Sequence, residues 1–155
     1  MPLEIERKFL IKNEDWRKQA DRGKTYIQGY LVGSRQASVR VRIQGEEAFI
    51  NIKSATLGVR RKEYEYPMPL EDAREILYEL CEQPLIEKTR YLVHDRDLCW
   101  EIDVFAGDNA GLVVAELELA SETQSYQRPA WLGEEVSADP RYYNVNLVKH
   151  PYKDW

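Results

Sequence analysis

The chain of 155 residues carries a net charge of −5, and hydrophobic residues make up 43% and aromatic residues 11% of it. This length suits one domain, residues 1–155, with a substantial core, and the composition excludes a disordered chain. The acidic balance argues against a nonspecific nucleic-acid binder, and the lack of an 18-residue apolar run argues against a membrane-spanning helix.

Eight segments alternate between apolar and polar residues and are rich in Val, Ile and Tyr, which predicts β-strands. In chain order they are 3–11, 26–31, 38–44, 48–53, 60–66, 86–94, 98–105 and 112–119. The connections "QGEE" at 44–47 and "HDRD" at 94–97 are short enough for hairpin loops, so most strands are expected to pair antiparallel.

Three other segments are predicted to be helical. The segment 69–81, "PLEDAREILYELC", has apolar residues at helical spacing and acidic residues in its first turn. Residues 13–20 suit a short helix capped by Asn13, and residues 139–150 suit another with Pro140 at its first position.

Cysteine and histidine content narrows the compartment and the chemistry. Cys81 and Cys99 do not form a CxxC pair, and the charged N-terminal segment does not resemble a signal peptide, so a cytoplasmic location is expected. The two histidines, His94 and His150, are too few for a histidine-rich zinc site. Any metal ion would be held by carboxylates, which favours Mg²⁺, Mn²⁺ or Ca²⁺.

Each predicted strand has one apolar face and one charged face. The charged set comprises Glu4, Glu6, Lys8, Arg40, Arg42, Lys53, Arg61, Glu63, Glu65, Lys88, Arg90, Glu101, Asp103, Glu116 and Glu118. The simplest interpretation is a sandwich with these faces in water. Their signs argue against it, because they form six like-charge pairs at i,i+2, whereas exposed sheet faces normally mix signs.

Clusters of like charge suit a site in which a ligand supplies the opposite charge. Carboxylates at strand spacing coordinate hard divalent cations, and Arg and Lys bind phosphate oxygens. In a closed barrel of about eight strands alternate residues face the lumen, so both sets could meet there around a metal–polyphosphate complex. The apolar faces would then lie outside, covered by helices or by a second subunit, which predicts a homodimer.

The segment "EIERKF" at 4–9 resembles the ExExK signature of the CYTH domain, a family also called the triphosphate tunnel metalloenzymes. Six further segments resemble the family in the same order: "VRVR" at 39–42, "NIK" at 51–53, "RKEYEY" at 61–66, "IEKTRY" at 86–91, "EIDVF" at 101–105 and "AELEL" at 115–119. ExExK alone is a weak pattern, but seven ordered segments over nearly the whole chain are specific. The resemblance, to the short bacterial-type inorganic triphosphatases, implies a mainly β protein of the α+β type: an eight-stranded antiparallel barrel closed into a tunnel, with a few flanking helices.

The resemblance also implies roles for individual residues. The metal ligands, for Mg²⁺ or Mn²⁺, would be Glu4, Glu6, Glu116 and Glu118. The triphosphate would be bound by Lys8, Arg40, Arg42, Lys53, Arg61, Arg90 and Tyr30. The catalytic set would be Lys88, which positions water, with Glu63, Glu65 and Asp103 in the lumen. Arg141, Tyr142 or Lys149 of the C-terminal helix would plug one tunnel end. Apart from the resemblance, Glu101 is the weakest member of the charged set and is expected near the barrel rim, and Arg7, which breaks the alternation, is expected to point outward.

Hydrolysis of inorganic tripolyphosphate to pyrophosphate and phosphate is the expected activity, because a short chain has little spare sequence for an adenine or thiazole pocket. Related members hydrolyse nucleoside triphosphates or thiamine triphosphate, and one branch of the family, the adenylyl cyclases, cyclises ATP, so these activities stay open. A noncatalytic polyphosphate-binding module is the alternative of another class. The expected partners are a small triphosphate and a second copy of the chain, with no nucleic acid and no membrane.

Overall fold

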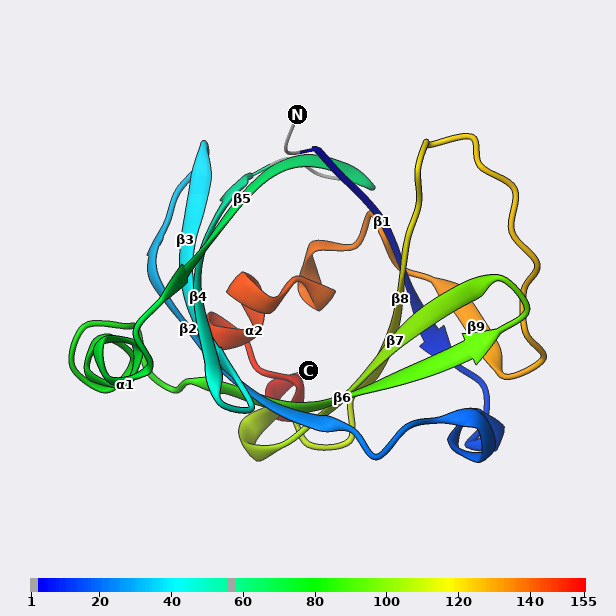
Figure 1. The fold of residues 1–155 in the computed structure, drawn as a ribbon, viewed down its shortest axis with the longest axis horizontal. Coiled ribbons are helices and arrows are strands. Elements are labelled where there is room, and N and C mark those ends of the chain that lie inside the picture. The colour runs from blue at the N-terminus through cyan, green and yellow to red at the C-terminus, as the bar shows by residue number, and fades with distance from the viewer. Residues whose placement is uncertain (1–2, 56–57) are drawn as a thin grey trace.

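The structure, a computed structural model, describes residues 3–55 and 58–155. Within these residues nine strands form an antiparallel sheet in the order β5-β4-β3-β2-β6-β7-β8-β1-β9, and a further pairing between β5 and β1 closes eight of them into a barrel (Figure 1). The strands are β1 (Leu3–Ile11), β2 (Lys24–Gly33), β3 (Ala37–Gln44), β4 (Glu47–Ser54), β5 (Arg60–Met68), β6 (Ile86–Asp95), β7 (Leu98–Phe105), β8 (Val113–Glu118) and β9 (Leu132–Glu135).

All eight predicted strands are present, which confirms the expected barrel. β1 and β7 have the predicted bounds, and the others differ by one or two residues at one or both ends. β9 was not predicted, because four residues, "LGEE", are too few to show alternation. It extends the sheet along the outer part of β1, next to Phe9 and Ile11.

The helical predictions are confirmed in place but not always in type. α1 (Leu70–Glu79) is a regular helix, whereas the segment after β1 forms only a 3₁₀ helix, η1 (Asp15–Gln19). The N-cap residue is Glu14 and not Asn13 as predicted; Asn13 precedes it, and its Oδ1 accepts a hydrogen bond from the Asp15 N–H at 2.9 Å. The predicted C-terminal helix is divided into η3 (Pro140–Tyr142) and α2 (Asn144–Lys149), because Tyr143 between them is extended. Two further 3₁₀ turns are η2 (Gly107–Asn109) and η4 (Tyr152–Asp154).

The hydrophobic core lies mainly outside the barrel wall, as the inverted arrangement of faces predicts. On one side Phe9, Trp100 and Trp131 pack edge to face, with the Phe9 and Trp131 rings each 5.6 Å from the Trp100 ring. On the other side α1 covers β3 and β4 through buried Ala73 and Leu77 (Figure 1). Of the helices in the described residues, none is long and apolar enough to cross a membrane.

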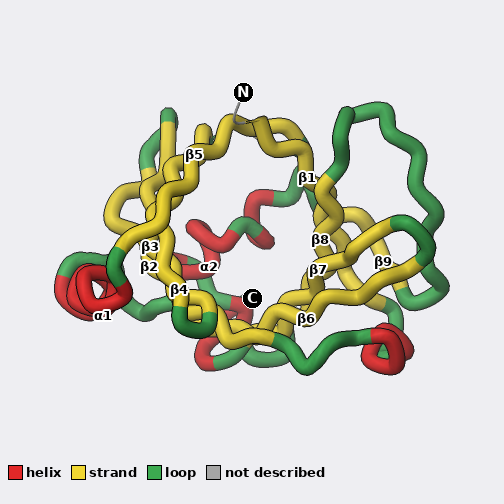
Figure 2. The backbone as a smooth tube through the Cα atoms, in the orientation of Figure 1, coloured by secondary structure: helices red, strands yellow, loops and turns green. Residues whose placement is uncertain are grey.

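α2 closes one end of the barrel, where Figure 2 shows it within the barrel opening. At this end the lumen-facing positions become apolar: they are Tyr30, Ile86, Phe105 and Val114, and Leu147 and Val148 of α2 pack against this cluster. A plug formed by the C-terminal helix is therefore present. The prediction of its contact residues is partly wrong. Tyr142 is buried in the cluster, as expected of a plug residue, but Arg141 and Lys149 are exposed.

The packing of α1 gives the first testable prediction. We expect Leu77→Ala to lower the free energy of unfolding by about 2–5 kcal/mol, because Leu77 is fully buried against β3 and β4 and its loss leaves a cavity. Leu80→Ala is the matched control, since its side chain is 65% exposed and the change should cost less than about 0.5 kcal/mol. Urea denaturation measures both, and equal losses would contradict the packing described.

Candidate active site

The barrel lumen contains a cavity of about 440 Å³ with mainly charged walls. All but one of the predicted site residues line it, namely Glu4, Glu6, Lys8, Tyr30, Arg40, Arg42, Lys53, Arg61, Glu63, Glu65, Lys88, Arg90, Glu116 and Glu118. The exception, Asp103, is fully buried and does not line the cavity. Strand alternation explains the convergence, because every second residue of each strand points to the same side of the wall.

Three carboxylates form the tightest acidic cluster in the described residues. One carboxylate oxygen from each of Glu6, Glu101 and Glu116 lies within 4.8 Å of the others. Glu101 lies here because it is the register partner of Glu116 across β7 and β8. The sequence placed Glu101 at the rim, and only the register, which alternation does not specify, brings it beside Glu6.

The carboxyl groups of this cluster differ in pKa. Burial opposes the ionisation of Glu116, but Lys8 and Arg90 overcome this effect and hold its pKa well below the ordinary value. Burial and the neighbouring charge of Glu116 raise the pKa of Glu6 well above its ordinary value. The protein therefore crowds carboxyl groups that its own cations do not fully neutralise. Such an oxygen donor set suits a hard divalent cation.

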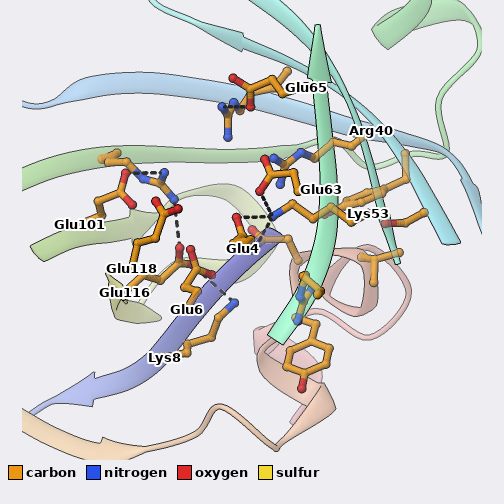
Figure 3. Close-up of a pocket in the computed structure, with 18 of the residues that line it drawn as sticks. Glu4, Glu6, Lys8, Arg40, Lys53, Glu63, Glu65, Glu101, Glu116 and Glu118 are labelled. Carbon is orange, nitrogen blue, oxygen red and sulfur yellow. Dashed lines mark hydrogen bonds and ion pairs between the residues drawn. The ribbon is translucent and has the colours of Figure 1, made fainter. Parts of the chain in front are cut away.

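Glu4 and Glu118 flank this cluster (Figure 3). Lys53 Nζ lies 3.3 Å from Glu4 Oε1 and 3.8 Å from Glu63 Oε2, so Glu4 already has a cationic neighbour. Burial and a hydrogen bond with Glu63 nevertheless raise the pKa of Glu4 from 4.5 to about 7. Burial and the charge of Glu4 also raise the pKa of Glu118.

The opposite part of the lumen is basic. Arg40 and Arg42 of β3 project into the cavity, and the Nε atoms of both are buried without a hydrogen-bond partner in the described part of the chain. Burial and the like charges of Arg40 and Arg90 lower the pKa of Arg42. Neighbouring guanidinium groups of like charge are stabilised by an anion bound between them, and the oxygens of a phosphate chain match their donor geometry.

Arg90 and Asp103 form the best-connected ion pair of the site. Arg90 Nε and Nη2 donate to the two Asp103 carboxylate oxygens at 2.7 and 2.9 Å, and Arg90 also pairs with Glu101 at 2.9 Å. Lys88 Nζ lies 2.7 Å from Asp103 Oδ2. Burial lowers the pKa of Lys88 to about 8, although Asp103 opposes this effect. Asp103 therefore holds two cations in place from a position outside the cavity.

Three residues that the sequence analysis did not single out also belong to the site. Asn51 is fully buried and donates to Glu63 and Glu65 at 2.9 and 2.7 Å, which holds these two acids side by side. A signal was available for Asn51, since it lies two residues before Lys53 on the same strand face. Tyr143 and Asn144 line the closed end of the cavity, and no pattern in the sequence indicated them.

Metal affinity is expected to rise with pH. In the free protein Glu4, with a pKa of about 7, and Glu6, with a raised pKa, hold protons that a bound cation must displace. Below pH 7, each unit of increase in pH should therefore lower the dissociation constant for Mn²⁺ about tenfold for each proton released. Isothermal titration at pH 6 and pH 8 measures this, and equal affinity at both values would contradict the expectation.

The same pKa shift has a consequence for the metal-free fold. The pKa of Glu4 is about 7 in the folded chain and 4.5 without the fold, so folding takes up protons between these values. Stability from this group is fully present below pH 4.5 and is lost as the pH rises through about 7.

Comparisons with known proteins agree with this geometry. Residues 2–152 match the CYTH domain family. An inorganic triphosphatase of Acetivibrio thermocellus is 44% identical over 155 residues, which cover 100% of this chain and 99% of the relative. An inorganic triphosphatase of Nitrosomonas europaea is 40% identical over 151 residues, 94% of this chain and 96% of the relative. A crystal structure of an inorganic triphosphatase matches the fold with a TM-score of 0.66 at 36% identity, covering 94% of this chain and 93% of that chain. The resemblance found in the sequence is thereby confirmed, and the chain belongs to the CYTH domain family.

Proposed function

We propose that this protein is an inorganic triphosphatase, a hydrolase that cleaves tripolyphosphate to pyrophosphate and phosphate. One observation carries the proposal: a single lumen holds a carboxylate cluster on β1, β7 and β8 and a basic wall on β3 and β4. The activity of the two relatives described above supports it. Residues 1–155 would act as one domain, because the barrel needs strands from β1 to β8 to close.

The cofactor would be Mg²⁺ or Mn²⁺. Glu6, Glu101 and Glu116 would hold it, with Glu4 and Glu118 beside them, because these carboxylates form an oxygen donor set without enough cations of their own. A bound divalent ion would supply charge neutralisation of phosphate oxygens and lower the pKa of bound water. Glu101 enters this set in addition to the residues that the family resemblance implies.

The side chains of the lumen would bind and orient the substrate. Arg40, Arg42 and Arg61, with Lys8, Lys53 and Arg90, would bind oxygens of the triphosphate and offset its charge as the terminal phosphoryl group is transferred. Lys88 would hold the attacking water through its ammonium group, with Glu63 or Glu65 available to accept a proton. Tyr30 would limit the length of chain that fits at the closed end.

The lining of the cavity favours transfer of a phosphoryl group to water over cyclisation of ATP. Its aromatic members, Tyr30 and Tyr143, both lie at the closed end beside α2, so they offer no stacking surface at the open end for a base. The same observation disfavours thiamine triphosphate. A noncatalytic polyphosphate-binding module would need the same cations, and turnover alone separates it from an enzyme.

A substrate panel tests the proposal. With Mg²⁺ or Mn²⁺, tripolyphosphate should release phosphate with a kcat/KM at least about tenfold above that for ATP or thiamine triphosphate. Pyrophosphate should accumulate and not be hydrolysed, because it is a product of the proposed reaction. Cyclic AMP as the main product from ATP would indicate a cyclase, and tight binding of tripolyphosphate without turnover would indicate a binding module.

A homodimer and a cytoplasmic location complete the proposal. Ile52, Tyr64 and Tyr66 leave an apolar strip on the outer face of β4 and β5, with Tyr66 54% exposed, where a second copy would cover it. Light scattering should then give twice the mass of the chain, and Tyr66→Lys should give the mass of one. The free thiols of Cys81 and Cys99 support a reducing compartment.

A further inference from the structure

The amide of Asn144, the first residue of α2, lies between two lumen side chains from different strands. Lys88 Nζ of β6 donates to Asn144 Oδ1 at 3.3 Å, and Gln28 Nε2 of β2 donates to the same oxygen at 3.1 Å. The orientation of the amide follows from this pair of donors, because only an oxygen can face both of them. The plug thus contributes a hydrogen-bond acceptor as well as apolar packing.

The second acceptor of Lys88 lies on another strand. Asp103 Oδ2 on β7 is 2.7 Å from Lys88 Nζ, and both side chains are almost completely buried. Two acceptors, one from β7 and one from α2, fix the direction of the ammonium group. In the described residues no further acceptor is found for its remaining N–H, and Lys88 lines the cavity, so that hydrogen is available to a phosphate oxygen or a water molecule.

Asn144 is itself held rigidly. Gln28 is fully buried, and its donation to Asn144 leaves its own Oε1 without a partner in the described part of the chain. An unpaired buried oxygen lowers the stability of the fold unless a water molecule in the lumen donates to it. Such a cost is retained where the arrangement serves the function of the site. α2 is anchored through Leu147 and Val148, which holds the backbone of Asn144 at the closed end of the barrel.

We infer that Asn144 is a positioning residue for Lys88, so that the C-terminal helix completes the catalytic site as well as closing the tunnel. This inference rests on the proposed function, in which Lys88 orients the attacking water. Loss of the acceptor should misdirect the ammonium group while the phosphate-binding arginines stay in place. The effect should therefore fall on kcat more than on KM.

Three variants separate this role from a packing role. Asn144→Leu has the same number and branching of side-chain heavy atoms and no acceptor, and its kcat for tripolyphosphate should fall at least about tenfold while KM changes less than about threefold. Asn144→Asp keeps the oxygen that accepts from Lys88 and Gln28, so its kcat should be restored to within about threefold, with a higher KM because its charge repels the triphosphate. Asn146→Ala is the control: within the described residues its side-chain amide donates only to the carbonyl of exposed Pro140, so its activity should be unchanged.

A crystal structure of Asn144→Leu provides a readout that does not depend on turnover. It should show Lys88 Nζ displaced from its present position, with α2 still seated in the barrel. An unmoved ammonium group, or a kcat in Asn144→Leu equal to that of the unsubstituted protein, would overturn the inference. If the unsubstituted protein does not hydrolyse tripolyphosphate, the proposed function fails, and the position of Lys88 in this crystal structure still decides whether Asn144 orients it.

Discussion

Glu6→Gln should abolish tripolyphosphate hydrolysis without unfolding the protein. The kcat is expected to fall at least about 100-fold, because the variant replaces a charged carboxylate of the cluster with Glu101 and Glu116 by a neutral amide, which is a weaker ligand for a divalent cation. The metal-free variant should be as stable as the unsubstituted protein or more stable. The reason is that Gln removes a carboxyl group whose pKa is raised by burial and by Glu116, which is a sign of unfavourable ionisation.

Thermal unfolding with and without Mn²⁺ separates the two effects. The unsubstituted protein should gain stability on addition of Mn²⁺, because an ion that binds only the folded state stabilises it. Glu6→Gln should gain little. Glu87→Gln is the control: Glu87 lies one residue before Lys88 but is exposed, so its activity and its response to Mn²⁺ should be normal. Full activity of Glu6→Gln with Mg²⁺ or Mn²⁺ would refute the metal assignment.

Arg90→Met should produce the largest loss of stability among the lumen variants. Arg90 makes two hydrogen bonds to Asp103, which is fully buried, and pairs with Glu101 and Glu116. Removing one partner of a buried ion pair leaves an uncompensated charge and costs about 3–5 kcal/mol. For a chain of this size the melting temperature should fall by about 6 °C or more. Activity should be lost as well, because Arg90 lines the cavity.

Arg60→Met is the matched control for this prediction. Arg60 belongs to β5, is 57% exposed and pairs with Glu122 at 3.5 Å. An exposed ion pair of this kind contributes about 0–1 kcal/mol. Equal losses of stability in Arg90→Met and Arg60→Met, measured by urea denaturation, would contradict the role of Arg90 as the organising cation of the buried network.

Much of the fold and the lining of the site could be predicted because both follow from strand alternation. Once Glu4, Glu6 and Lys8 face the lumen, every charged pair on the other strands must face it too, and the closed barrel brings them together. The like signs of neighbouring charges were the decisive signal, since an exposed sheet face does not tolerate them. Arg7, which interrupts the alternation, points outward as predicted and pairs with Glu135.

What the sequence did not provide is the distance of each side chain from its neighbours. Glu101 joins the carboxylate cluster through the register of β7 and β8, and Asp103 is withdrawn from the cavity by its pairing with Arg90 and Lys88. Alternation assigns a face but not a depth or a partner. Asn144 was missed for another reason: the tail was expected to form a helix that plugs the barrel, but the sequence does not indicate which of its side chains face the lumen.

The most direct test of the account is the product of a single reaction. Incubation of the protein with tripolyphosphate and Mg²⁺, followed by ³¹P NMR, should show pyrophosphate and phosphate appearing in equal amounts, with no reaction when the metal is omitted or when Glu6→Gln replaces the unsubstituted protein. Stable tripolyphosphate in the presence of the unsubstituted protein and Mg²⁺ or Mn²⁺ would contradict the assignment of this lumen as the active site of a triphosphatase.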